Sequence, residues 1–229
     1  MRFIHMADMH FDTPFTFLNT KDFLGNKRRL EQRQIFKKII NYIKENQIPY
    51  LFICGDLYDH KYVKETTVEF INNLFKNIPN TKIFIVPGNH DPLLKNSYYS
   101  NYNWSQNVYI LNSEIHLYEF DDVDIYGFGF EDFYLKTNNI ENIKIKNKNK
   151  INILLTHASL NASEINEMQY NPILENTLKA IGFDYVALGH IHKREIFSKN
   201  IVYPGSAISL GFDELGEHGI LDVNLNKNN

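Results

Sequence analysis

The chain has 229 residues, 43% of them hydrophobic, and a formal net charge of −3 at pH 7. This length and composition are typical of one large domain with a buried core. The only cysteine, Cys54, excludes an internal disulfide and a thiolate metal cluster. No apolar run approaches the roughly 18 residues that span a membrane, and the first residues lack a signal-peptide pattern, so we expect a cytoplasmic protein without a membrane partner.

The first half of the chain alternates predicted strands and helices. Apolar runs of the kind that form buried strands occur at 2–7, 50–54 and 83–86. Between them, apolar residues at helical spacing predict helices over about 28–44 and 68–78. This order predicts neighbouring parallel strands that are joined by right-handed crossovers.

The second half is less regular. A polar, tyrosine-rich stretch at 95–106 predicts a surface loop, and the Asn- and Lys-rich segment 138–150 predicts a solvated charge run, with phosphate contacts by its lysines as the alternative. A helix is expected to begin at Asn171-Pro172 and to end at Gly182, since Pro favours the first helical position and Gly the C-cap. Further strands are expected at 108–111, 115–120, 123–130, 151–155, 185–188, 195–197, 201–203 and 219–223.

Side chains of the types that bind metal ions follow five of the predicted core strands, at the point where each strand ends. Ligands of α/β sheets bind at that carboxyl end. A single Asp or His after a strand is more often a turn or a hydrogen-bonded loop residue, but five such strand ends together are hard to explain by accident. The residues are Asp8 and His10; Asp56 and Asp59; Asn89, His90 and Asp91; His157; and His190 and His192.

The mixture of donors indicates the kind of metal. Carboxylates, an amide oxygen and imidazoles without sulfur suit Mn²⁺, Fe²⁺ or Zn²⁺. The donors are too many for one ion with an open position, and they match two ions that share a bridging carboxylate, for which Asp56 is the natural candidate. Two divalent cations would turn the formal charge of −3 into +1. The charge of the sequence alone therefore does not exclude a polyanionic substrate.

As an ordered set, these motifs resemble those of the calcineurin-like metallophosphoesterases. The motifs are Asp8-x-His10, Gly55-Asp56-x-x-Asp59, Gly88-Asn89-His90-Asp91, His157 and Gly189-His190-x-His192. The runs at 5–10, 184–192, 203–206 and 216–219 are most similar to the DNA-repair exonuclease branch of that family, the SbcD- and YhaO-like proteins.

The resemblance implies an αββα sandwich of two mixed sheets with helices outside. It implies that one metal takes Asp8, His10 and His192 and that the other takes Asn89, His157 and His190, with Asp56 bridging. His90 would then be the catalytic acid that protonates the leaving group, and Asp59 would orient it. Two cations would supply hydroxide at neutral pH, which attacks phosphorus, and would neutralise charge on the phosphoryl oxygens.

The function expected from the resemblance is that of a Mn²⁺-dependent DNA nuclease in DNA repair, a 3′→5′ exonuclease with some single-strand endonuclease activity. Phe15, Phe17 and Tyr58 lie near the metal motifs, where they either stack on bases or pack in the core. One alternative is a phosphodiesterase or phosphatase that acts on nucleotides or other small esters, since a fold does not set its substrate. Another is a non-catalytic scaffold with the same fold.

We expect one phosphoesterase domain over residues 1–229. SbcD-like proteins continue into a DNA-capping domain and a segment that binds an ATPase, and this chain is expected to lack both. An SbcC-like ATPase partner is therefore in doubt, and a homodimer is the other partner that the resemblance leaves open.

Overall fold

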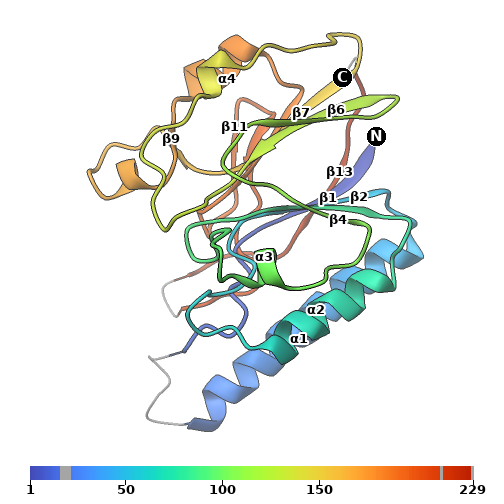
Figure 1. Ribbon diagram of the computed structural model, residues 1–229, viewed down its shortest axis with the longest axis vertical. Helices are drawn as coiled ribbons and strands as arrows, with labels where there is room; N and C mark the ends of the chain where they lie inside the picture. Colours follow the sequence, from blue (N-terminus) through green and yellow to red (C-terminus); the bar gives the residue numbers. More distant parts are fainter. Residues whose placement is uncertain (16–21, 212–213, 228–229) are drawn as a thin grey trace.

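The computed structural model describes residues 1–15, 22–211 and 214–227. Two β-sheets lie face to face, and helices cover their outer faces (Figure 1). This is the αββα sandwich that the resemblance implies.

The first sheet has the strand order β13-β1-β2-β3-β4. Its four strands β1 to β4 are parallel to one another, and β13 pairs with β1 in the antiparallel direction. The predicted parallel neighbours in the first half of the chain are thereby confirmed. The strands are β1 (Arg2–Met6), β2 (Tyr50–Cys54), β3 (Lys82–Val86), β4 (Val108–Ile110) and β13 (Leu221–Asn224).

The second sheet has the strand order β11-β12-β10-β7-β6-β5. The four inner strands are parallel, and the two edge strands are antiparallel to their neighbours. These strands are β5 (His116–Glu119), β6 (Val123–Phe128), β7 (Ile151–His157), β10 (Tyr185–Gly189), β11 (Glu195–Phe197) and β12 (Ile201–Tyr203). A separate short pair is formed by β8 (Ser159–Leu160) and β9 (Pro172–Ile173).

Helices α1 (Asp22–Glu45) and α2 (Glu65–Lys76) lie together on one side of the molecule, and α4 (Glu175–Ile181) lies on the opposite side (Figure 1). The inner strands β1, β2 and β3 of the first sheet are buried on both faces, as expected of parallel strands. In β2, for example, Leu51 packs toward α1 and α2, whereas Phe52 packs between the two sheets. Packing on both faces therefore sets where the inner strands of the first sheet end.

The predicted helix start at Asn171-Pro172 is wrong. Pro172 begins β9, and the helix begins only at Glu175. The cause is a tertiary contact, because the Asn171 side-chain amide donates to the Thr156 hydroxyl and to the His157 carbonyl at the end of β7. The predicted helix end is confirmed, since Gly182 has the left-handed conformation of a C-cap.

The stretch 95–106 is more ordered than a surface loop. It contains α3 (Tyr98–Asn101), and Tyr99 is buried. Within 138–150, the short 3₁₀ helix η2 (Ile140–Asn142) buries Ile140, while Lys146 and Lys150 pair with Glu119 and Asp124. The second 3₁₀ helix, η3 (Glu167–Gln169), precedes β9.

Two of the three candidate stacking residues belong to the interior. Phe15 and Tyr58 are buried, so neither presents a ring to a base. Phe17 lies outside the described residues. No helix in the described ranges is long and apolar enough to cross a membrane.

Candidate metal centre

The metal-type side chains predicted from the sequence gather where the carboxyl ends of β1, β2, β3, β7 and β10 meet. Backbone hydrogen bonds tie the segments together: the Asp8 N–H donates to the Gly55 carbonyl (3.1 Å) and the His10 N–H to the Asp56 carbonyl (2.9 Å). At Gly189, a Cβ atom would collide with the Cys54 carbonyl of the other sheet. Only glycine allows the sheets to approach so closely at this end.

Four of the seven predicted ligands have positive φ angles. Their values are 53° for Asp8, 47° for His10, 52° for Asp56 and 107° for His190. Such conformations are unfavourable for residues with a Cβ atom, and they persist where the surrounding structure enforces them, often at functional sites. Four of the ten non-glycine residues with positive φ in the described part of the chain are thus residues that the sequence selects as ligands.

The site contains three groups of three potential ligand residues. Within each group, the ligand atoms lie within 4.8 Å of one another. Asp8, His10 and Asp56 each belong to two of these groups, and Asp56 is the residue predicted to bridge the two ions. His90, predicted as the catalytic acid, lies in one of them. The groups are Asp8, His10 and His192; His10, Asp56 and His90; and Asp8, Asp56 and His157.

His10 tests whether this cluster fits a metal ion. Its Nδ1–H donates to the Asp59 carboxylate at 3.1 Å, which leaves Nε2 with a free lone pair. That Nε2 atom is buried and has no hydrogen-bond partner among the described residues. An unsatisfied buried acceptor costs about 1–3 kcal/mol, and a bound cation would remove that cost. The donor set therefore fits divalent metal ions.

His157 is oriented in the same way from the second sheet. Its Nδ1–H donates to the Cys54 carbonyl (2.9 Å), so Nε2 faces Asn89 Oδ1 (3.0 Å) and Asp56 Oδ2 (3.3 Å). A hydrogen bond on one ring nitrogen that fixes the other for a metal is typical of histidine ligands.

The buried carboxylates are compensated by histidines. Burial lowers the pKa of His157, but Asp56 and Asp8 outweigh this effect and raise the pKa to about 9. Burial likewise raises the pKa of Asp56, and the nearby histidines, His157 foremost, bring it below its usual range. Metal binding at such a site exchanges protons on histidine for cations.

Asp59 accepts hydrogen bonds from two histidines at once. Its Oδ1 lies 3.1 Å from His10 Nδ1 and 2.9 Å from His90 Nδ1. The hydrogen bond from His90 to Asp59 is the main cause that raises the pKa of His90 to about 9. The side chain of His90 is 52% exposed, whereas those of His10 and His157 are buried. His90 therefore lies at the solvent side of the cluster.

His190 and His192 occupy different positions. The His192 Nδ1 lies 2.5 Å from Glu214 Oε1, and its ring belongs to the group with Asp8 and His10. The His190 ring lies outside the three groups, with its centre 5.1 Å from that of His157, and burial lowers its pKa to about 3. Its backbone N–H donates to Asp8. The ligand roles of both residues stay predictions.

Two supporting residues were not assigned from the sequence. Glu214 lies in a segment without any recognisable pattern, and nothing in the sequence links it to His192. Asp91 was counted among the donors but given no role; it is fully buried and accepts backbone N–H groups from Gly88 (2.7 Å), Asp56 (3.0 Å) and Leu57 (2.7 Å). Asp91 therefore ties the loop after β3 to the loop after β2.

Residues 1–194 match the family described as calcineurin-like phosphoesterase, and the chain therefore belongs to this family. The family and the fold indicate a metallophosphoesterase, which is a hydrolase, and the chain has candidate ligand groups for metal ions. Two curated relatives are each 26% identical to this chain. They are the metallophosphoesterase YhaO of Bacillus subtilis strain 168 and the D subunit of the nuclease SbcCD of Staphylococcus epidermidis.

The matches cover nearly all of this chain but not all of the relatives. The YhaO match includes 96% of this chain and 56% of YhaO, and the match to the SbcCD subunit includes 99% of this chain and 67% of that protein. The chain thus spans little more than half the length of YhaO. Among solved structures, TT1561 of Thermus thermophilus has a TM-score of 0.48 and 11% identity, over 89% of this chain and 88% of that one.

Proposed function

We propose that the chain is a DNA nuclease that uses two divalent metal ions, with Mn²⁺ as the first choice. The observation that carries this proposal is the buried donor cluster with the half-exposed His90 at its rim, held by Asp59. DNA as the substrate is supported by the similarity to the nuclease subunit.

We assign the ligands in two sets. Asp8, His10 and His192 would hold one ion, and the unsatisfied Nε2 of His10 supports this set. Asn89, His157 and His190 would hold the other, with Asp56 between the two sets. Bound there, the ions would lower the pKa of water and neutralise charge on the phosphoryl oxygens.

His90 and Asp59 would act on the leaving group. Asp59 accepts the Nδ1–H of His90, so the Nε2 atom of His90 is the one that can give a proton to the departing oxygen. The partly exposed position of His90 allows the oxygen of a large substrate to approach it. Asp59 also keeps the His10 ring in place, so a single carboxylate aligns a predicted ligand and the acid.

A comparison of substrates tests the proposal. End-labelled single-stranded, blunt and recessed DNA would be incubated with the purified chain and Mn²⁺, Mg²⁺ or EDTA, beside cyclic nucleotides. We expect Mn²⁺-dependent shortening of DNA from its 3′ ends, with internal cleavage of single strands. Hydrolysis of cyclic nucleotides without cleavage of any DNA would favour the small-ester alternative, and inactivity on both with metal bound would favour the scaffold.

The cellular location and the partners of the chain are also proposals. A role in DNA repair in the cytoplasm and an ATPase partner of the SbcC type follow from the similarity to the SbcCD subunit, and homodimer formation is a further proposal. Pull-down of an SbcC-type protein by the tagged chain would support the ATPase partner.

A further inference from the structure

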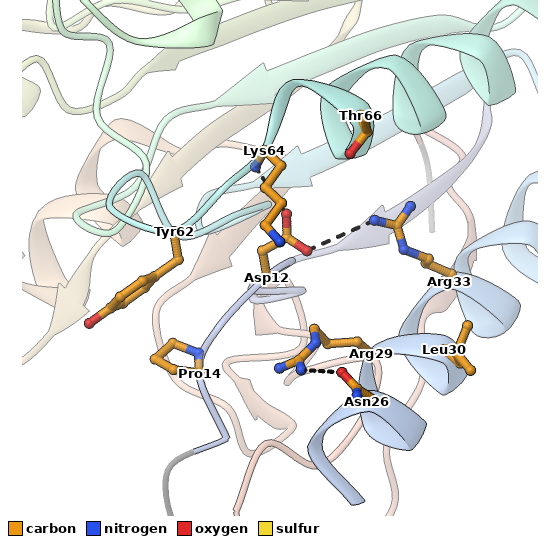
Figure 2. Close-up of a pocket in the computed structure, with 9 residues that line it drawn as sticks. All are labelled: Asp12, Pro14, Asn26, Arg29, Leu30, Arg33, Tyr62, Lys64 and Thr66. Atoms are coloured by element: carbon orange, nitrogen blue, oxygen red, sulfur yellow. Dashed lines mark hydrogen bonds and ion pairs between the residues drawn. The ribbon is translucent and has the colours of Figure 1, made fainter. Parts of the chain in front are cut away.

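A second cavity lies beside the metal centre, between the beginning of α1 and the N-terminus of α2. Its volume is about 650 Å³. Figure 2 shows Arg33 extending from α1 toward Asp12 and Arg29 turned toward Asn26, with Lys64 above them at the start of α2. The lining contains no predicted metal ligand. We call this cavity the basic pocket.

The basic pocket carries an excess of positive charge. Among the residues that the structure describes, three cationic side chains, Arg29, Arg33 and Lys64, line it together with one carboxylate, Asp12. That carboxylate is already engaged, because it accepts the Lys64 backbone N–H (3.1 Å) and the Thr67 hydroxyl (2.5 Å) at the start of α2. Its nearest cation is Arg33, at 3.9 Å.

The other two cations have no acidic partner among the described residues. The Arg29 guanidinium donates to the neutral side-chain oxygen of Asn26 at 2.6 Å. The Lys64 ammonium forms no ion pair within the described part of the chain. Both groups can therefore bind an anion, and an Arg fork matches the geometry of a phosphate.

The basic pocket joins the metal centre. Pro14 and Tyr62 line it and also line a cavity of about 440 Å³ that contains Asp59, Asn89 and His90. Tyr62 is 42% exposed, and the exposed residues Phe133 and Tyr134 line the cavity that contains His90. Aromatic rings beside a basic groove are the usual means of holding a single strand, since bases stack on the rings and phosphates meet the cations.

We propose that the basic pocket binds a phosphate of a nucleic-acid strand other than the phosphate at the metal centre. This inference rests on the proposed nuclease function and narrows it, because the preferred substrate becomes an oligonucleotide rather than a mononucleotide or another small ester. Arg29 and Lys64 contact the remote phosphate, and Tyr62 lies between the two phosphate positions.

The test compares Arg29→Ala and Lys64→Ala with Lys38→Ala. Lys38 is exposed on the same helix, α1, and does not line the basic pocket, so its removal controls for the loss of a positive charge. Binding of a fluorescein-labelled thymidine oligonucleotide to the metal-free full chain is measured over a range of salt concentrations. Hydrolysis of the oligonucleotide and of bis(p-nitrophenyl) phosphate is measured with Mn²⁺.

We expect each pocket variant to weaken oligonucleotide binding about tenfold. The slope of the logarithm of the binding constant against the logarithm of the salt concentration should become less steep by about 0.7 for each lost phosphate contact. Hydrolysis of the small diester should stay unchanged, and Lys38→Ala should match the wild type. Arg29→Lys should recover part of the affinity, which separates a charge contact from a folding defect. Equal affinity in all variants, or an equal loss with Lys38→Ala, would overturn the proposal.

The same measurements separate this inference from the proposed function. If the wild type hydrolyses the small diester but not the oligonucleotide, the nuclease proposal fails. Binding that depends on Arg29 would then still support the phosphate site, and binding that does not would reject it.

Discussion

At the level of single residues, the site depends on carboxylates that fix histidine rings. Asp59 accepts a hydrogen bond from both His10 and His90, and Glu214 accepts one from His192. Each of these bonds holds a ring in one orientation and selects the nitrogen that faces the cluster. The two carboxylates should nevertheless differ in effect, because His90 is assigned to proton transfer and His192 to metal binding.

Replacement of His90 tests the first of these assignments. His90→Asn should keep the bound metal and lower the hydrolysis of alkyl phosphodiesters by about 10²–10⁴-fold, the usual contribution of a general acid. The loss should be much smaller for a p-nitrophenyl ester, whose leaving group needs no proton. Rates on both substrates and elemental analysis of the same sample provide the check. A parallel loss of metal and activity would contradict the role in proton transfer.

Replacement of Glu214 tests the assignment of His192 to metal binding. Glu214→Gln keeps the shape of the side chain but removes the charge that would make His192 a stronger ligand, so the affinity for Mn²⁺ should fall about 10–100-fold if His192 binds the metal. Calorimetric titration with Mn²⁺ measures this affinity. Glu217→Gln is the matched control, since Glu217 is exposed and pairs with Arg194. An affinity equal to that of the control would exclude Glu214 as a support of the metal centre.

At the level of helices and loops, a short helix supports the loops of the candidate metal centre. The Tyr99 hydroxyl, on α3, donates to Asp91 at 2.6 Å, and Asp91 in turn accepts the backbone N–H groups that join the loops after β2 and β3. Local pattern does not indicate this arrangement, because a polar segment rich in tyrosine is typical of a loop. The hydrogen bond between Tyr99 and the buried Asp91 carboxylate cannot be read from that pattern.

Tyr99→Phe should therefore destabilise the fold. The variant leaves the buried Asp91 carboxyl without one of its hydrogen-bond partners, which costs about 1–3 kcal/mol of unfolding free energy. Urea unfolding measures the cost. Tyr98→Phe serves as the control, because the Tyr98 hydroxyl has no hydrogen bond to any other described residue. If both variants lose the same unfolding free energy, the hydrogen bond between Tyr99 and Asp91 does not contribute to the stability of the fold.

Across the complete fold, the features that could be predicted from the sequence are those that follow from local residue patterns and from the order of the motifs. Apolar runs and helical spacing were enough for the parallel strands β1 to β3, and the residue types at the strand ends indicated the candidate metal cluster. The contacts that link distant segments were not predictable. Asn171 turned an expected helix start into a strand, and Glu214 reaches His192 from a segment with no pattern at all.

A buried histidine joins the two sheets and makes stability depend on pH. His5, on β1, accepts the Tyr185 hydroxyl at Nδ1 and donates from Nε2 to the Leu188 carbonyl, each at 3.0 Å. Both bonds suit the neutral ring, and burial lowers the pKa of His5 from 6.5 to about 3. Between these two pKa values the unfolded chain binds a proton that the folded chain does not, so stability falls as pH falls below 6.5.

Unfolding of the metal-free chain at pH 7 and pH 5 tests this linkage. At pH 5 the contribution of His5 should have fallen by about 2 kcal/mol, at about 1.36 kcal/mol per pH unit. His5→Gln cannot take up the proton, so its stability should change less over the same range. Equal changes in the two proteins would show that His5 is not the group responsible.

The function proposed here depends above all on the clustered Asp, Asn and His side chains binding a pair of metal ions. Anomalous diffraction from crystals grown with Mn²⁺ tests this directly. We expect two peaks in contact with Asp56, one beside Asp8, His10 and His192 and one beside Asn89, His157 and His190, with neither peak retained in Asp56→Ala. Crystals of the wild type without a peak at this site, or with manganese bound only elsewhere, would contradict it.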